Sequence, residues 1–241
     1  MYPLRIISFI ALTGVIFTLH AESSYSLRQL KQLARQGYSE AQLALANRYF
    51  LGKKIKKNYE RAAFWYHKAG AQRNVSAYFM LGNIYLNGLG VSKDHKKARA
   101  WYYKAARKGH AKSQFELGDL YRTGTGVKKD YKKMYFWYSR SAVQGYAPAQ
   151  SNLAMAYLKG VGTRQDYQKA LKWYQRAANN GFYHAQYSLG YMHQMGYATA
   201  VDYKQAIKWY RRAARQGSLS ARASLIELRN AGYIDDLYVD N

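Results

Sequence analysis

The chain has 241 residues and a formal charge of +25 at pH 7, because 38 lysines and arginines outnumber 13 aspartates and glutamates. Its lack of cysteine excludes disulfides, thiolate metal sites, cysteine nucleophiles and a lipid-modified N-terminal cysteine. Two prolines are too few for a disordered linker protein, and a hydrophobic share of 49% is enough for a sizeable core.

The first 21 residues have the pattern of a secretory signal peptide. One positive charge, Arg5, precedes an apolar run over residues 6–19, and a small residue, Ala21, follows it. Such a run is too short to cross a bilayer comfortably but suits a signal-peptide core. We therefore expect cleavage after Ala21 and a periplasmic or secreted protein without a transmembrane span. Leu19 stands where a small residue is preferred, so an uncleaved membrane anchor is the alternative.

A constant spacing of 36 residues runs through the rest of the chain. In each repeat a tyrosine follows a tryptophan, and an aspartate or asparagine stands seven residues before it. A glycine stands eight residues after the tryptophan in every repeat except the first, which has Arg73 there. This regularity is typical of a stacked repeat protein. The tryptophans are Trp65, Trp101, Trp137, Trp173 and Trp209.

Each repeat is predicted to form two helices. In residues 94–109 the apolar positions follow the i, i+3, i+4, i+7 pattern of an amphipathic second helix. Asp94 is suited to cap the start of this helix, and Gly109 is suited to the left-handed position that ends it. The shorter first helix lies around residues 77–88, before the turn NGLGV.

At one position of the first helix, every repeat has either glycine or alanine. Glycine inside a helix costs about 1 kcal/mol relative to alanine, so its presence needs a structural reason. We expect a neighbouring helix to pass too close for a larger side chain. The residues at this position are Ala46, Gly82, Gly118, Ala154 and Gly190.

The segment AYFMLGNIYLNGLGVSKDHKKARAWYYKAARKG, residues 77–109, resembles the Sel-1-like repeat, a relative of the tetratricopeptide repeat. The chain departs from the repeat pattern at residues 52–55, GKKI, and at Ala198, where a glycine is expected. The resemblance implies an all-α fold, a right-handed α-α superhelical solenoid of five 36-residue helix pairs with half-repeat caps. It also implies an adaptor, often in bacterial envelopes or at host–microbe contacts.

Both ends of the repeat region have the pattern of half-repeats, which are expected to cover the apolar faces of the terminal layers. We assign residues 1–21 to the signal peptide and 22–37 to an N-terminal capping helix. Residues 38–218 form the five repeats, and residues 219–241 form a C-terminal capping helix with an acidic tail.

No pattern of catalytic, cofactor-binding or metal-ligating residues stands out. The aspartates recur once per repeat, so they do not converge on one substrate as acid–base pairs must. The histidines lack metal-ligand spacing, and the GLGV and GTGV turns lack the lysine of a phosphate loop. The tryptophans and tyrosines are expected to form the core, although an aromatic ligand groove is the alternative. We therefore expect a protein that is not an enzyme.

The leading hypothesis is a scaffold that binds a protein or peptide partner through the concave face of its first helices. One row on this face changes from amide to apolar side chains along the chain. The candidate contact residues are Asn47, Asn83, Asp119, Met155, Tyr191 and Arg122.

Lysines crowd the turns between the two helices of a repeat, where they oppose the dipole of the second helix. In a solenoid these turns share an edge, so the lysines are expected to form a basic ridge. The ridge either keeps the protein soluble or attracts an anionic polymer, such as an envelope lipid, a cell-wall polymer or a host glycan. Export argues against nucleic acid as the target. The ridge residues are Lys53, Lys54, Lys56, Lys57, Lys93, Lys96, Lys128, Lys129 and Lys132.

Overall fold

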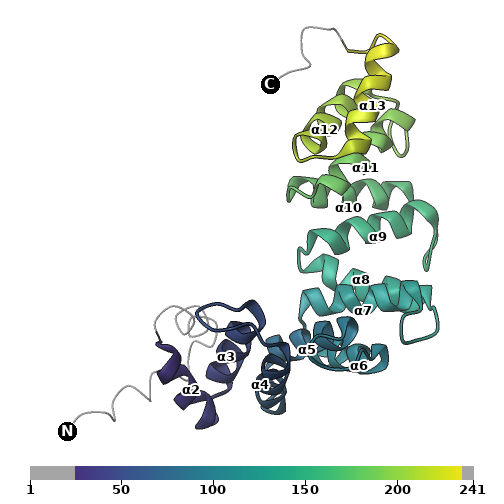
Figure 1. Ribbon diagram of the computed structural model, residues 1–241. Helices are drawn as coiled ribbons and strands as arrows, with labels where there is room; N and C mark the ends of the chain where they lie inside the picture. Colours follow the sequence, from purple (N-terminus) through teal and green to yellow (C-terminus); the bar gives the residue numbers. More distant parts are fainter. Residues whose placement is uncertain (1–24, 235–241) are drawn as a thin grey trace, which may run out of the picture. The chain divides into compact units, whose positions relative to one another are not determined.

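The computed structural model describes residues 25–234, and this part of the chain consists of helices joined by short turns (Figure 1). The expected signal peptide, residues 22–24 and the acidic tail from residue 235 lie outside the described residues. The described part is all-α, as predicted, with twelve helices. They form two compact units, one reaching to Ser113 and including Thr125–Val127, the other made of Gln114–Gly124 and the residues from Lys128 onward.

The helices pack in consecutive pairs, which confirms the predicted repeat. We call the first helix of a pair helix A and the second helix B. The first unit contains α2 (Leu27–Arg35) and the pairs α3 (Ser39–Leu51) with α4 (Tyr59–Ala71) and α5 (Val75–Asn87) with α6 (His95–Arg107). The second unit contains α7 (Ala111–Thr123) from Gln114 on, α8 (Tyr131–Val143), α9 (Ala147–Lys159), α10 (Tyr167–Asn179), α11 (Tyr183–Met195), α12 (Tyr203–Arg215) and α13 (Leu219–Asn230).

The predicted caps of the B helices are confirmed. In every repeat the capping side chain accepts a hydrogen bond from the backbone N–H three residues later, at 2.8–2.9 Å. This bond satisfies one of the donors that a helix start leaves unpaired. It also lowers the pKa of the carboxyl groups of Asp94, Asp130 and Asp166. The caps are Asn58, Asp94, Asp130, Asp166 and Asp202.

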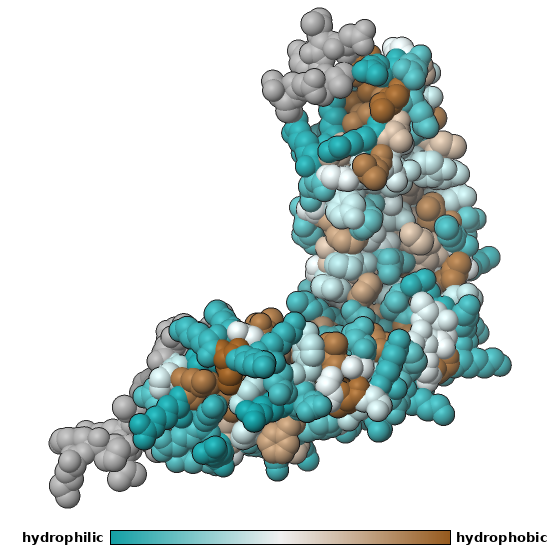
Figure 2. All heavy atoms as spheres, in the orientation of Figure 1, coloured by the Kyte–Doolittle hydropathy of each residue, from teal (hydrophilic) through white to brown (hydrophobic). Residues whose placement is uncertain are grey.

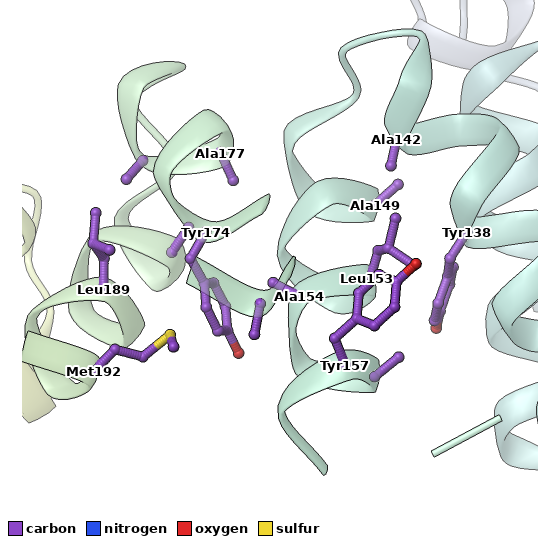
Figure 3. Packing of buried hydrophobic residues seen from close by; sticks show 14 of the residues in the cluster. Tyr138, Ala142, Ala149, Leu153, Ala154, Tyr157, Tyr174, Ala177, Leu189 and Met192 are labelled. Atoms are coloured by element: carbon purple, nitrogen blue, oxygen red, sulfur yellow. The ribbon is translucent and has the colours of Figure 1, made fainter. Parts of the chain in front are cut away.

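The aromatic ring at the centre of each repeat is the tyrosine and not the tryptophan. All five of these tyrosines are at most 1% exposed. Figure 3 shows two of them, Tyr138 and Tyr174, in a cluster with buried leucines and alanines of the A helices. Trp137 and Trp209 are buried as well, at 7% and 5% exposure, but the other three tryptophans are only half-buried. A cation three residues later covers several of the indole rings, as Lys104 does for Trp101 at 3.9 Å from the ring centroid. The central tyrosines are Tyr66, Tyr102, Tyr138, Tyr174 and Tyr210.

The small residue in helix A faces this tyrosine, so the predicted close approach is confirmed. A Cβ atom added at Gly190 would lie 2.8 Å from the ring of Tyr210, and one added at Gly118 would lie 2.6 Å from the ring of Tyr138. Gly82 has the same relationship to Tyr102. The nearest group is therefore the tyrosine ring of helix B, and at Gly190 the backbone oxygen of Ala206 also lies 3.1 Å from the added Cβ.

Buried glutamines connect successive helices, a device that the sequence patterns did not reveal. Gln150 of α9 donates to the carbonyl oxygen of Ala142 in α8 at 3.2 Å and accepts from Asn180, just after α10, at 3.2 Å. Gln186 repeats this arrangement with Ala178 and Gln216. One side chain thus ties three consecutive helices together. In the first unit Gln42 has the same role.

The two departures from the repeat pattern, Lys54 and Ala198, lie in turns between helix A and helix B at a position with a left-handed backbone. Gly162 has a φ of 75°, and it lies against the backbone of Tyr131 at the start of the preceding helix B. Ala198 adopts the same left-handed backbone, with a φ of 65°. Lys54 does so as well, with a φ of 60°. A side chain at either position is held in a conformation that favours glycine.

No helix within residues 25–234 combines the length and the apolar composition that a bilayer span requires.

Candidate functional site

The candidate partner-binding row lies on helix A, directly after the small residue that faces the core tyrosine. This register places each side chain at the margin between the core and solvent. Asn47, Asn83 and Asp119 are half-buried, whereas Met155 and Tyr191 are 43% and 38% exposed. The first unit carries the two asparagines, and the second unit carries the other three residues.

In the first unit both asparagines are hydrogen-bonded to the core. The hydroxyl of Tyr66 donates to Oδ1 of Asn47 at 2.7 Å, and the hydroxyl of Tyr102 donates to Oδ1 of Asn83 at 2.6 Å. These bonds satisfy tyrosine hydroxyls that are buried away from water. They also fix the orientation of each amide, with its oxygen toward the core.

In the second unit Asp119 is held from two sides. The hydroxyl of Tyr138 donates to its Oδ1 at 3.0 Å, and Nε of Arg122 donates to the same oxygen at 2.7 Å. Burial, followed by the nearby Asp119 carboxylate, raises the pKa of Tyr138. The hydrogen bond to Asp119 raises the pKa of Arg122. Arg122 therefore lies beside the row, as expected, but its guanidinium is engaged by a residue of the same helix.

Glu116 lies one turn before Asp119 on α7 and is half-buried as well, and the sequence patterns did not single it out. Burial, and then the charge of Asp119 one turn away, raises the pKa of the Glu116 carboxyl above its usual range. The two carboxyl groups form a small acidic cluster on one face of α7 in a strongly basic protein. Their spacing of three residues could have indicated this cluster, because residues i and i+3 are neighbours on a helix.

In the fourth and fifth repeats the residue of the row does not accept a hydrogen bond from the core tyrosine in the way that Asn47, Asn83 and Asp119 do. Met155 offers no oxygen, so its position in the row stays apolar and exposed. In the fifth repeat the hydroxyl of Tyr210 donates to Oε1 of Gln194 at 2.6 Å, one turn further along helix A. In this repeat Gln194, and not Tyr191, is therefore the acceptor for the core tyrosine. The row thus combines three side chains held by core tyrosines with two exposed side chains that have large apolar surfaces.

The nine lysines of the expected basic ridge are all exposed. Six belong to the first unit and three to the second. The ion pairs that lysines form in the described part of the chain join Lys97, Lys133 and Lys169 to the helix caps three residues earlier, and none involves these nine. Lys57 lies over the ring of Tyr59 at 4.7 Å from its centroid. Their charges are therefore open to solvent.

Groups of three or more histidine, aspartate or glutamate side chains that could hold a metal ion do not occur among residues 25–234. The histidines have other surroundings. His67 bonds the hydroxyl of Tyr85 at 3.0 Å, and His110 bonds the hydroxyl of Ser113 at 2.9 Å.

Comparisons with known proteins give one family and several solved relatives. The Sel1 repeat family matches residues 39–74, 75–110, 111–146, 147–182 and 184–218. No curated protein matched the chain.

Two solved structures are similar to the chain at 31% identity. One is a protective antigen present in uropathogenic Escherichia coli strains, with a TM-score of 0.83, covering 90% of this chain and 49% of the antigen. The chain thus spans about half the length of that relative. The other is a Sel1 repeat protein from Oxalobacter formigenes, with a TM-score of 0.81, covering 92% of this chain and 88% of that protein.

An immunity protein from Pseudomonas aeruginosa shares the fold alone. It is 21% identical, with a TM-score of 0.50 over 87% of this chain and 83% of that protein.

Proposed function

Because the chain belongs to the Sel1 repeat family, we propose that it is a non-catalytic scaffold that binds a protein partner through the A helices of its second unit. The contact residues of this proposal are Asp119, Met155 and Tyr191. The observation that carries it is the contrast along the row: Asp119 is fixed by Tyr138 and Arg122, whereas Met155 and Tyr191 present exposed apolar surface. Methionine and tyrosine are enriched in the buried centres of protein interfaces.

The first unit offers a second set of contacts to a partner. Asn47 and Asn83 are held by Tyr66 and Tyr102, so their amides keep one orientation before a partner arrives. Side chains ordered in advance lose less conformational freedom on binding. This preorganisation supports recognition of an extended segment by polar contacts.

Export of the scaffold is part of the proposal. The apolar run before Ala21 and the similarity to a protective antigen of uropathogenic E. coli both support a place in the periplasm or outside the cell. A role in the envelope or in contact with a host fits either place.

Site-specific crosslinking tests the binding face. A photoreactive amino acid replaces Met155 or Tyr191 in cells that make the protein, and the same residue at exposed Val143 of α8 serves as the control. We expect the same protein to be crosslinked from positions 155 and 191 and not from position 143. Crosslinking of that protein from all three positions would contradict the assignment to the A helices.

Salt separates this function from an electrostatic one. Binding through Met155 and Tyr191 depends on apolar contact, so we expect the affinity to change little between about 50 and 200 mM salt. Loss of binding on changing Met155 to Glu, but not on changing Val143 to Glu, supports the same face.

A second candidate function is the binding of an anionic polymer through the basic turns. The observation that favours it is the exposure of all nine lysines without a carboxylate partner in the described part of the chain. Affinity for soluble polyphosphate that falls steeply with salt, and that falls further when the lysines are changed to glutamine, tests this function.

A further inference from the structure

The first unit carries most of the unbalanced charge. Residues 25–113 contain 19 lysines and arginines but only three acidic residues, Glu40, Glu60 and Asp94. Asp94 caps α6 and pairs with Lys97, and Glu40 accepts a hydrogen bond from Asn74 at 3.1 Å. Little negative charge is therefore left to neutralise the surface. A partner of this unit that exploits charge must be anionic.

The turn between α3 and α4 mixes this charge with apolar side chains. Its residues 51–57 read LGKKIKK, and all four lysines are exposed. Leu51 is 64% exposed among them, while Ile55 packs partly against the core of the unit. We call residues 51–57 the lysine turn. The lysine turn therefore offers positive charges for an anionic group and an exposed leucine for apolar contact.

Lys54 stands where the second, third and fourth repeats have glycine. In the later turns this position lies against the preceding helix B, as Gly162 does against Tyr131. The left-handed backbone of Lys54 disfavours a side chain, yet lysine stands there.

The exposed side of α4 also combines basic side chains with an apolar one. Lys57, Arg61, Phe64 and Lys68 follow one face at intervals of four, three and four residues. Phe64 is 53% exposed, and Nζ of Lys68 lies 5.6 Å from the centre of its ring. Lysines, Lys172 and Lys208, replace this phenylalanine in the last two repeats. Figure 2 shows apolar residues scattered over a largely hydrophilic surface in the segment from α2 to α6.

We infer that the lysine turn and the exposed side of α4 bind the surface of an anionic lipid bilayer. The inference rests on the second candidate function and names its ligand. The lysines lie at the level of the headgroups, and Leu51 and Phe64 enter the boundary of the acyl chains. Basic residues beside aromatic and aliphatic ones are the composition of interfacial membrane-binding surfaces.

A lipid surface fits these residues better than a soluble polyanion or an acidic protein. A soluble polyanion neutralises the lysines but offers no apolar phase to Leu51 or Phe64, which would stay exposed to water. An acidic protein partner would have to supply an apolar pocket for each of them. A bilayer provides both environments side by side.

Vesicle flotation of the full chain tests the inference. Vesicles of phosphatidylcholine with about one third phosphatidylglycerol are compared with vesicles of phosphatidylcholine alone. Any contribution of the apolar run over residues 6–19 is common to both kinds of vesicle, so the difference between them reports the basic surface. We expect binding at least tenfold tighter to the anionic vesicles.

Charge variants locate the binding surface. Changing Lys53, Lys54, Lys56 and Lys57 to glutamine should weaken binding to anionic vesicles by about fivefold per lysine. The matched control changes Lys159, Lys172, Lys204 and Lys208, four exposed lysines of the second unit, to glutamine. We expect the control to weaken binding far less. Equal losses in the two variants would overturn the inference, because net charge alone would then explain the binding.

Apolar variants separate lipid from the other anionic partners. Changing Leu51 and Phe64 together to serine should weaken vesicle binding at least tenfold and leave binding of polyphosphate unchanged. Both side chains are exposed, so circular dichroism and melting should be unaffected. Polyphosphate binding through the lysine turn without any vesicle binding would refute the lipid surface and leave the second candidate function standing. Absence of both would refute the two together.

Discussion

The hydroxyl of Tyr102 donates a 2.6 Å hydrogen bond to Oδ1 of Asn83, which lies 19 residues earlier on the paired helix. The same spacing joins Tyr66 to Asn47 and Tyr138 to Asp119. In these three repeats the bond links the buried tyrosine ring to a half-buried side chain of helix A. Core stability and the chemistry of the candidate binding face are therefore coupled through one oxygen atom.

Replacing Asn83 with leucine should cost about 1–3 kcal/mol in unfolding free energy, because the buried hydroxyl of Tyr102 loses its acceptor. Asn83→Asp keeps an acceptor oxygen, as Asp119 does naturally, and should cost much less. Urea unfolding followed by circular dichroism measures both. Equal losses from the two variants would show that the hydrogen bond is unimportant.

Replacing Ala198 with glycine should stabilise the protein by about 1 kcal/mol, because a left-handed backbone disfavours a side chain. The matched control is Ala200→Gly in the same turn, where φ is not positive and added chain freedom should slightly destabilise. Thermal melting of both variants checks the opposite signs. A melting temperature lowered by both changes would argue against strain at Ala198.

Replacing Trp137 with alanine should cost about 3–5 kcal/mol, since its ring is buried. Trp173 occupies the same register but is half-buried, with Arg176 over its ring at 4.6 Å from the centroid. Trp173→Ala should therefore cost clearly less. Chemical denaturation of the two variants gives the comparison, and identical losses would contradict the difference in burial.

Lowering the pH from 7 to 5 should destabilise the first unit through His67. Burial, followed by the charges of Lys104 and Lys97, lowers the pKa of His67 from its usual 6.5. The unfolded chain then takes up a proton more readily than the folded chain, so stability present above pH 6.5 is lost as the pH falls. The raised pKa of Glu40 acts in the opposite direction.

The variant His67→Gln isolates this contribution, because both proteins keep Glu40. We expect its unfolding free energy to fall less between pH 7 and pH 5 than that of the wild type. Parallel pH profiles for the two proteins would exclude His67 as the source.

The sequence predicted the parts of the fold that repeat with a fixed step. Aspartates at the helix starts and small residues in helix A need only a neighbour along the chain or the next helix, and both were predicted correctly. The choice of tyrosine over tryptophan as the central ring was not predictable, because both residues lie on the apolar side of one helix. Only the rotation of helix B against helix A decides which ring enters the core.

The candidate site was less accessible to sequence reasoning. The 36-residue spacing on helix A predicts the row Asn47, Asn83 and Asp119 as a candidate surface, but it does not predict the bonds to core tyrosines, because these bonds join different helices. The role of this row, and of the basic turns, in partner binding stays a prediction. An acceptor oxygen recurring 19 residues before a buried tyrosine was the available signal.

The glutamine bridges have a consequence for how such a chain changes length. Gln150 and Gln186 each take their acceptor eight residues upstream and their donor 30 residues downstream. Excision of residues 147–182 would bring Gln186 onto Ala142 with the same spacing that it now has to Ala178. Gain or loss of a 36-residue block between these two glutamines therefore keeps the spacing on which the bridge depends, so the array can change length there without a new kind of contact.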